Sequence, residues 1–146
     1  MDRQNCQLAD PALAARLLRV RVADLLQGTA PAPLTPKDGG LLGALFESLV
    51  TLSVRVSAQG AEAEVNHFRT YRGDREVDLI VKGESGRVLA VEAKLAAAPA
   101  GDAGAHLNWL QGELGDELLD KLITTGPSAY RSADGIAVVP AALLGP

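Results

Sequence analysis

Apolar and polar residues alternate most regularly over residues 76–82 and 88–94. In the first stretch every second residue is apolar, which predicts a strand with one buried face and places Asp78 on the opposite face. Glycines and small polar residues between the two stretches favour a turn. The pattern therefore predicts a β-hairpin. Its predicted buried face consists of Val77, Leu79, Val81, Leu89 and Val91.

The second strand of this hairpin ends in two charged residues. Because strand side chains alternate, Glu92 and Lys94 share a face with Val88 and Ala90. A charged pair at the end of an apolar strand is costly to bury unless it has a partner or a use. This strand end is therefore a candidate site. The alternative is a structural ion pair in which Lys94 neutralises Asp78 or Glu92.

Helical spacing dominates the N-terminal third. Asp10-Pro11 is typical of a helix start, with an acidic N-cap followed by proline, and leucines at helical spacing continue the pattern toward Leu25. A second helix is predicted over residues 41–56, where apolar residues form one broad arc. Glu47 lies at the edge of this arc, from which its side chain can reach the sheet. The alternative is a glutamate in water at the rim of the helix.

The rest of the chain contains shorter elements separated by glycine and proline. Residues 28–36 are predicted to form a proline-rich loop, and residues 95–104 an Ala- and Gly-rich connection. The mixed alternation of residues 64–71 is typical of a strand at the edge of a sheet, in which His67 is interpreted as a half-buried packing residue, the alternative being a base. The other predicted elements are a tight turn over 72–75, a helix over 105–114, a strand over 118–125 and a short strand over 135–139.

Length and composition favour one α/β domain. The 146 residues are enough for one core, placed at 39–146, after an N-terminal helix and proline-rich loop at 1–38. The single cysteine, Cys6, excludes a disulfide within the chain and favours a reducing, cytoplasmic setting. The first residues lack the features of a signal peptide, and no apolar run is expected to be long enough to span a bilayer, so we expect no membrane association.

The net charge of -4 arises from the last third of the chain. Residues 95–146 contain 2 basic and 6 acidic side chains, and the sequence lacks the basic stripe typical of a nucleic-acid-binding protein. Three arginines, Arg69, Arg72 and Arg75, nevertheless cluster around one predicted turn. They are candidates for contacts with the phosphate backbone of a nucleic acid. The alternative is a solvated hairpin tip.

The candidate acids occur in a defined order, with Glu47 on a helix, Asp78 on a central strand and Glu92-Ala93-Lys94 at the end of the next strand. This order resembles the PD-(D/E)xK nuclease superfamily, whose core is a helix, a three-strand meander, a helix and a further strand. In particular, the chain resembles the nuclease-like domain of unknown function found C-terminal to AAA-class P-loop ATPases. The segments that carry the resemblance are Gln7–Leu13, Gly43–Glu47, Phe68–Thr70, Arg75–Asp78 and Val91–Lys94.

The resemblance implies a restriction-endonuclease-like α/β core with an added N-terminal helix, and a site for Mg²⁺ or Mn²⁺. Asp78 and Glu92 would be oxygen ligands of the kind that such ions prefer, and Glu47 would hold the same ion or a second one. Lys94 would orient the attacking water or stabilise charge on the phosphorane. Val77 stands where the superfamily name has proline, a position that varies within the superfamily.

Two functions follow from these expectations. The first is a metal-dependent endonuclease or exonuclease that hydrolyses DNA phosphodiesters through Glu47, Asp78, Glu92 and Lys94. The second is a catalytically inactive nuclease-fold module that binds DNA, or that docks to an AAA-class ATPase or another protein. The sequence has no Gly-x-x-x-x-Gly-Lys-Ser/Thr phosphate loop, so it does not bind ATP by that route.

Overall fold

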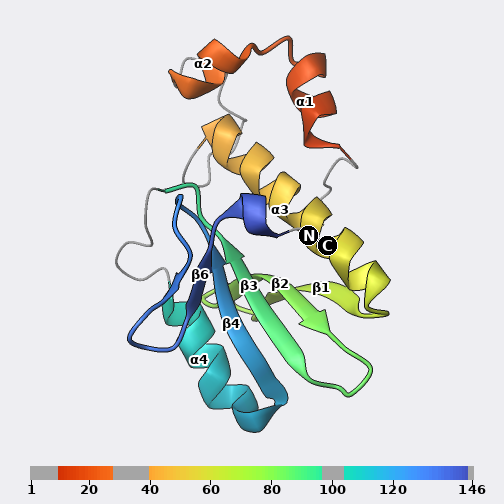
Figure 1. The fold of residues 1–146 in the computed structure, drawn as a ribbon, viewed down its shortest axis with the longest axis vertical. Coiled ribbons are helices and arrows are strands. Elements are labelled where there is room, and N and C mark those ends of the chain that lie inside the picture. Colours follow the sequence, from red (N-terminus) through yellow and green to blue (C-terminus); the bar gives the residue numbers. More distant parts are fainter. Residues whose placement is uncertain (1–9, 28–39, 97–103, 145–146) are drawn as a thin grey trace.

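The computed structural model describes residues 10–27, 40–96 and 104–144, which form a mixed α/β domain (Figure 1). The helices are α1 (Pro11–Leu17), α2 (Val22–Leu26), α3 (Gly40–Gly60) and α4 (Ala105–Leu114). The strands are β1 (Glu64–Arg69), β2 (Glu76–Lys82), β3 (Val88–Ala93), β4 (Leu118–Thr124), β5 (Tyr130–Arg131) and β6 (Ala137–Val139). Short 3-10 helices, η2 (Gly115–Glu117) and η3 (Ala141–Leu143), follow α4 and β6. Cys6, the proline-rich loop and most of the 95–104 connection lie outside the described residues.

The sheet combines antiparallel and parallel strands in the order β1-β2-β3-β4-β6-β5. Strands β1, β2 and β3 form an antiparallel meander, α4 then crosses over to place β4 parallel to β3, and β6 is parallel to β4. The succession of α3, meander, α4 and β4 follows the predicted order. The predicted edge position of β1 is confirmed. Periodicity did not predict β5, because a strand of two residues shows no period.

Two apolar clusters hold α3 and α4 against opposite faces of the sheet. The cluster under α3 contains Val50, Leu79 and Val91. Because Val91 and Ala90 are neighbours on β3, they point to opposite faces, and Ala90 belongs to the cluster under α4. That second cluster consists of Val77, Ala90, Leu107, Leu110, Ile123 and Ile136. The central strands are therefore covered on both faces.

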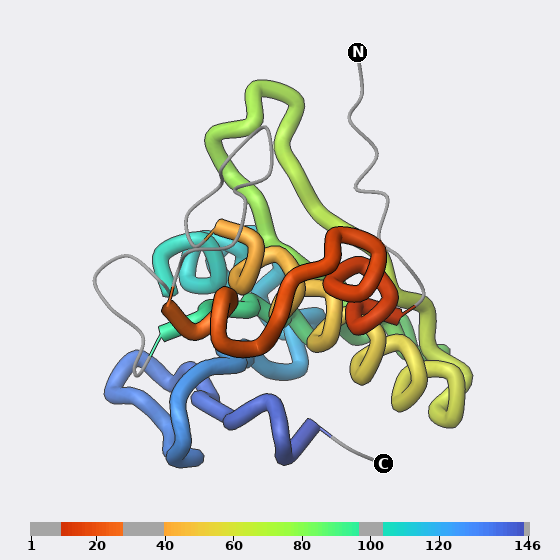
Figure 2. Tube along the Cα trace, turned by 90° about the horizontal axis from the view of Figure 1, so that it is seen from above, coloured from red at the N-terminus to blue at the C-terminus, as the bar shows by residue number. Residues whose placement is uncertain are grey.

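The predicted N-terminal helix is divided into two. Asp10 caps α1 as predicted, accepting a hydrogen bond from the backbone N–H of Ala12 at 2.8 Å. Helix α1 ends at Leu17, and Arg19 adopts a left-handed φ of 55°, so the chain turns before α2 begins. The continuation toward Leu25 as one helix is therefore wrong. Both short helices contact α3 and lie across it (Figure 2).

Helix α3 is longer than the predicted helix over 41–56, since it begins at Gly40 and continues to Gly60. An 18-residue window of α3 has a mean hydropathy of 1.5, and 17% of that window is buried. By length and composition alone this helix could cross a membrane, so the expectation that no apolar run reaches that length is wrong. Only Glu47 and Arg55 carry charge in it, while Val50 packs it on the sheet.

Candidate functional site

A β-bulge in β2 shapes the end of the hairpin next to the candidate site. Asn66 and Phe68 of β1 pair with Ile80 and Val77, so β2 has one residue more than β1 between these pairs. The extra residue reverses the alternation of side chains. Val77 packs under α4, whereas Leu79 packs under α3. The prediction of one shared buried face is wrong for Val77, because periodicity assumes a regular strand.

Asp78 lies in this bulge, where β2 and β3 part. The ladder between these strands ends at the pair Leu79 and Val91. Next to this pair, Oδ2 of Asp78 accepts a hydrogen bond from the backbone N–H of Ala93 at 2.9 Å. A side-chain oxygen thus takes the place of a backbone carbonyl as the partner of this N–H. The hydrogen bond fixes the carboxylate of Asp78 between the two strands.

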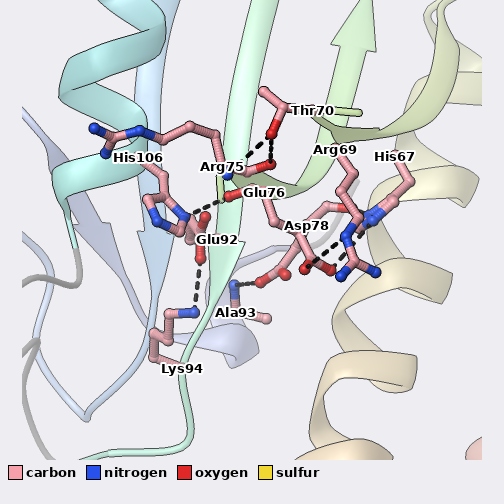
Figure 3. Close-up of polar contacts among 10 residues, drawn as sticks. All are labelled: His67, Arg69, Thr70, Arg75, Glu76, Asp78, Glu92, Ala93, Lys94 and His106. Carbon is pink, nitrogen blue, oxygen red and sulfur yellow. Dashed lines mark hydrogen bonds and ion pairs between the residues drawn. The ribbon is translucent and has the colours of Figure 1, made fainter. Parts of the chain in front are cut away.

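Glu92 occupies the same end of β3, and its side chain is only 3% exposed. Its Oε2 lies 2.7 Å from Nζ of Lys94, whose side chain is 42% exposed (Figure 3). Its Oε1 is buried and has no hydrogen-bond partner among the residues that the structure describes. Because an unpartnered buried carboxylate oxygen is costly, a cation or a proton at Oε1 would stabilise this site.

Burial and neighbouring charges shift the titration of both groups. Burial, followed by the negative charge of Asp78, raises the pKa of Glu92 to about 7, although the contact with Lys94 opposes this shift. Burial lowers the pKa of Lys94, but its hydrogen bond to Glu92 and the charges of Glu92, Asp78 and Glu47 outweigh burial and raise it. Lys94 therefore stays cationic, and Glu92 is the member of the pair that changes charge near neutral pH.

Glu47 approaches the same region from α3. Its negative charge helps to raise the pKa of Lys94, so the helix and the strand end are electrostatically linked. Within residues 10–27, 40–96 and 104–144, no three His, Cys, Asp or Glu side chains are grouped in a way that could hold a metal ion. The negative charge of Asp78 acts on Glu92, and ligand roles for Asp78, Glu92 and Glu47 all stay predictions.

Glu76 and two histidines extend this polar cluster (Figure 3). His106 of α4 donates from Nδ1 to the carbonyl of Glu76 at 2.7 Å, and His67 of β1 donates from Nδ1 to the carbonyl of Asp78 at 3.0 Å. Nε2 of His67 lies 3.3 Å from Oε1 of Glu76. Because His67 is exposed, its interpretation as a half-buried packing residue is wrong. Its role depends on the bulge, which leaves no signal in the apolar pattern.

The three arginines near the β1–β2 turn have different surroundings. Nε of Arg69 lies 3.9 Å from Oε2 of Glu76, and the guanidinium of Arg75 stacks over Trp109, 5.7 Å from the ring centroid. Arg72 is exposed in the turn itself. The hairpin that carries them, light green in Figure 2, projects from the body of the domain. Phosphate binding by these arginines stays a prediction.

A family model matches most of the chain, from α3 to the C-terminal turn. Its description is domain of unknown function (DUF4143), and it covers residues 42–144, which include Asp78, Glu92 and Lys94. The chain belongs to the DUF4143 family. The match confirms the predicted relationship to a domain of unknown function, and it transfers no activity to the site. No curated protein and no solved structure matches the chain. Helices α1 and α2 precede the part that DUF4143 covers.

Proposed function

We propose that this DUF4143 domain is a metal-dependent nuclease that hydrolyses DNA phosphodiesters in the cytoplasm. The observation that carries the proposal is the buried carboxylate of Glu92, with Oε1 unpartnered among the described residues and Oε2 in contact with Lys94. The carboxylate of Asp78 is fixed at the same strand end by the N–H of Ala93. A cluster of this kind is costly for a purely structural role, so it supports a restriction-endonuclease-like site.

The two carboxylates suit Mg²⁺ or Mn²⁺. These ions prefer hard oxygen ligands, and Mg²⁺ usually keeps several waters, so one or two carboxylates are sufficient protein ligands. Asp78 and Glu92 would hold the ion, and the carbonyl of Ala93 and the carboxylate of Glu47 are further candidate ligands. Oε1 of Glu92 would thereby gain a partner. When bound, such an ion polarises the phosphodiester and lowers the pKa of an attacking water.

Lys94 is the protein group proposed to act on the substrate. Its ammonium is held by Glu92, yet 42% of the side chain is exposed, so it can donate to a phosphate oxygen or orient the attacking water. Hydrolysis joins the water oxygen to phosphorus, breaks one P–O ester bond and moves one proton from the water to the departing alcohol. Because its contacts raise the pKa of Lys94, this residue stays protonated and stabilises the negative charge that develops.

The β1–β2 turn would supply contacts to DNA. Arg72 is exposed at this turn, and Arg75 lies three residues before Asp78. Phosphates on either side of the bond to be cut would therefore meet positive charge close to the carboxylates. Such contacts release counterions, so their contribution to DNA binding falls as the salt concentration rises.

The proposal predicts that Mn²⁺ stabilises the folded domain. At about 100 times its dissociation constant, an ion that binds only the folded state adds about 2.7 kcal/mol, or about 5–10 °C in Tm. The substitution Asp78→Asn should abolish this rise, because it removes a ligand charge while its amide oxygen can still accept the Ala93 N–H. Differential scanning fluorimetry with a series of Mn²⁺ concentrations measures both effects.

The matched control for this experiment is Glu84→Gln, which removes one exposed carboxylate in the β2–β3 turn. This variant should respond to Mn²⁺ like the wild type. Equal responses of Asp78→Asn and Glu84→Gln would show that the ion binds elsewhere, and the metal site would then be wrong.

A surface feature favours the second function, an inactive module that docks to another protein. Large aliphatic side chains are exposed on three neighbouring helices, which is unusual for a monomeric domain. They are Leu13, Leu17 and Leu18 near α1, Val22 and Leu26 on α2, and Leu49, Leu52 and Val56 on α3. Arg16 and Arg19 are exposed among them. The partner proposed for this helical surface is an AAA-class P-loop ATPase with an apolar patch edged by acidic residues.

If the domain docks through this helical surface, the double substitution Leu17→Glu with Leu26→Glu should abolish binding to a purified AAA-class ATPase domain from the same genome. Each leucine is about 70% exposed, so the substitution would replace an apolar contact with a charge. Isothermal titration calorimetry measures the affinity. Leu119→Glu is the control, since Leu119 on β4 is 54% exposed and lies outside the helical surface. If the double variant binds the ATPase as tightly as the Leu119→Glu control does, this surface is not the docking site.

A further inference from the structure

The bulge in β2 places Asp78 beyond the end of the regular β2–β3 ladder, so the ladder does not fix its backbone. In a regular ladder, backbone groups of β2 would pair with those of β3 beyond Leu79 and Val91, but the ladder stops there. The N–H of Ala93 is taken by the carboxylate of Asp78 instead. The carboxylate is consequently directed by the backbone of a bulged segment, and whatever fixes that backbone also fixes Asp78.

His67 meets this requirement from the neighbouring strand. Its Nδ1 donates to the carbonyl of Asp78 at 3.0 Å, and its Nε2 lies 3.3 Å from Oε1 of Glu76. A carbonyl only accepts hydrogen bonds, so Nδ1 of His67 is the donor in the contact with Asp78. His67 thus bridges residues 76 and 78 across the bulge. On the other side, His106 holds the carbonyl of Glu76 at 2.7 Å.

We infer that His67 is a positioning residue, which keeps Asp78 oriented for metal binding by holding its backbone carbonyl. His67 itself would touch neither the ion nor DNA. The consequence for metal affinity rests on the proposed nuclease function, whereas the positioning of Asp78 does not, because the contact between Asp78 and Ala93 exists without metal. Partners that orient a metal ligand typically change metal affinity by about 10–100-fold when they are removed.

Two isosteric substitutions separate the two contacts of His67. In His67→Asn, the side-chain amide nitrogen takes the place of Nδ1 and can still donate to the carbonyl of Asp78. In His67→Gln, the amide nitrogen takes the place of Nε2, so only the contact with Glu76 is retained. The ring is exposed at an edge strand, with 36% of the side chain accessible, so both variants should fold.

The first measurement is amide hydrogen exchange of the metal-free protein, followed by NMR. In His67→Gln the N–H of Ala93 should exchange about tenfold faster than in the wild type, because Asp78 no longer holds its position. In His67→Asn its rate should stay within about twofold of the wild type. The amide of Val81, which lies inside the regular ladders with both β1 and β3, is the internal reference. Equal rates in both variants, or faster exchange only in His67→Asn, would overturn the inference.

The second measurement is Mn²⁺ affinity by isothermal titration calorimetry. His67→Gln should weaken binding about tenfold or more, and His67→Asn should bind nearly as tightly as the wild type. Affinities that fall equally in both variants would likewise overturn the role assigned to His67. A wild type that does not bind Mn²⁺ would refute the metal proposal itself, and the exchange rates would still decide whether His67 positions Asp78.

Discussion

Lys94→Ala should reduce DNA cleavage by about 10²–10³-fold while Mn²⁺ still raises the melting temperature. The size of the effect is that of removing one preorganised donor to charge that develops in a transition state. The ion remains bound in this variant because Asp78 and Glu92 are unchanged, and loss of a nearby positive charge favours the cation further. Cleavage of labelled single- and double-stranded DNA, measured beside scanning fluorimetry on the same preparation, gives both quantities.

Lys82→Ala is the matched control for Lys94→Ala, since it removes an exposed lysine from the far end of β2. It should cut DNA at the wild-type rate. Cleavage at the wild-type rate by Lys94→Ala would show that Lys94 is only the ion-pair partner of Glu92. A wild type that cuts neither DNA substrate with Mn²⁺ or Mg²⁺ would refute the nuclease and leave the docking module as the remaining function.

The regular elements of this domain were predictable because their patterns repeat over several residues. Strand β2 and helix α4 begin and end at the predicted residues, since alternation over 76–82 and helical spacing over 105–114 are each bounded by turn or glycine signals. The shared face of Glu92 and Ala90 follows from the same alternation, and Ala90 packs under α4. The candidate carboxylates could therefore be assigned to one strand end from the sequence.

The bulge could not be predicted, because one inserted residue leaves the apolar pattern of β2 unchanged. Val77 and Leu79 are two apart, as in any amphipathic strand, and only the pairing with β1 reveals that they face opposite layers. The contacts of His67 and His106 depend on that pairing and on the placement of α4. They involve residues 11 and 30 positions apart in the chain, which local periodicity does not report.

Buried Lys121 is a second example of a feature that local patterns miss. A lysine in a strand is expected to reach water, yet Lys121 is only 5% exposed. Its Nζ donates to Oδ1 of Asn108 at 2.6 Å and to the carbonyl of Asp134 at 3.0 Å. Both partners are 13 residues away in sequence, so tertiary structure alone explains how this charge is accommodated.

The raised pKa of Glu92 predicts an unusual dependence of stability on pH. Burial and the charge of Asp78 raise this pKa from 4.5 to about 7 on folding. Between these values the folded protein binds a proton that the unfolded chain has lost, so the contribution of Glu92 to the free energy of unfolding falls as pH rises. Without metal, the wild type should lose about 2–3 kcal/mol of this contribution between pH 5 and pH 8.

Glu92→Gln tests this directly, because glutamine resembles the protonated glutamate and stays neutral at every pH. In a chelator, the variant should be about 1 kcal/mol more stable than the wild type at pH 5 and about 3 kcal/mol more stable at pH 8. Urea unfolding at several pH values measures the difference in free energy of unfolding between the two proteins. The contributions of titrating groups that both proteins share cancel in this difference. A difference that does not change between pH 5 and pH 8 would contradict the raised pKa.

Mn²⁺ should reverse this order of stability. The ion requires the ionised carboxylate of Glu92, whose charge is costly in the buried site of the metal-free protein. Binding offsets that cost, so the wild type should gain more stability from Mn²⁺ at pH 8 than at pH 6, whereas Glu92→Gln should gain little at either pH. A metal response of Glu92→Gln equal to that of the wild type would show that Glu92 is buried for a reason other than holding a cation.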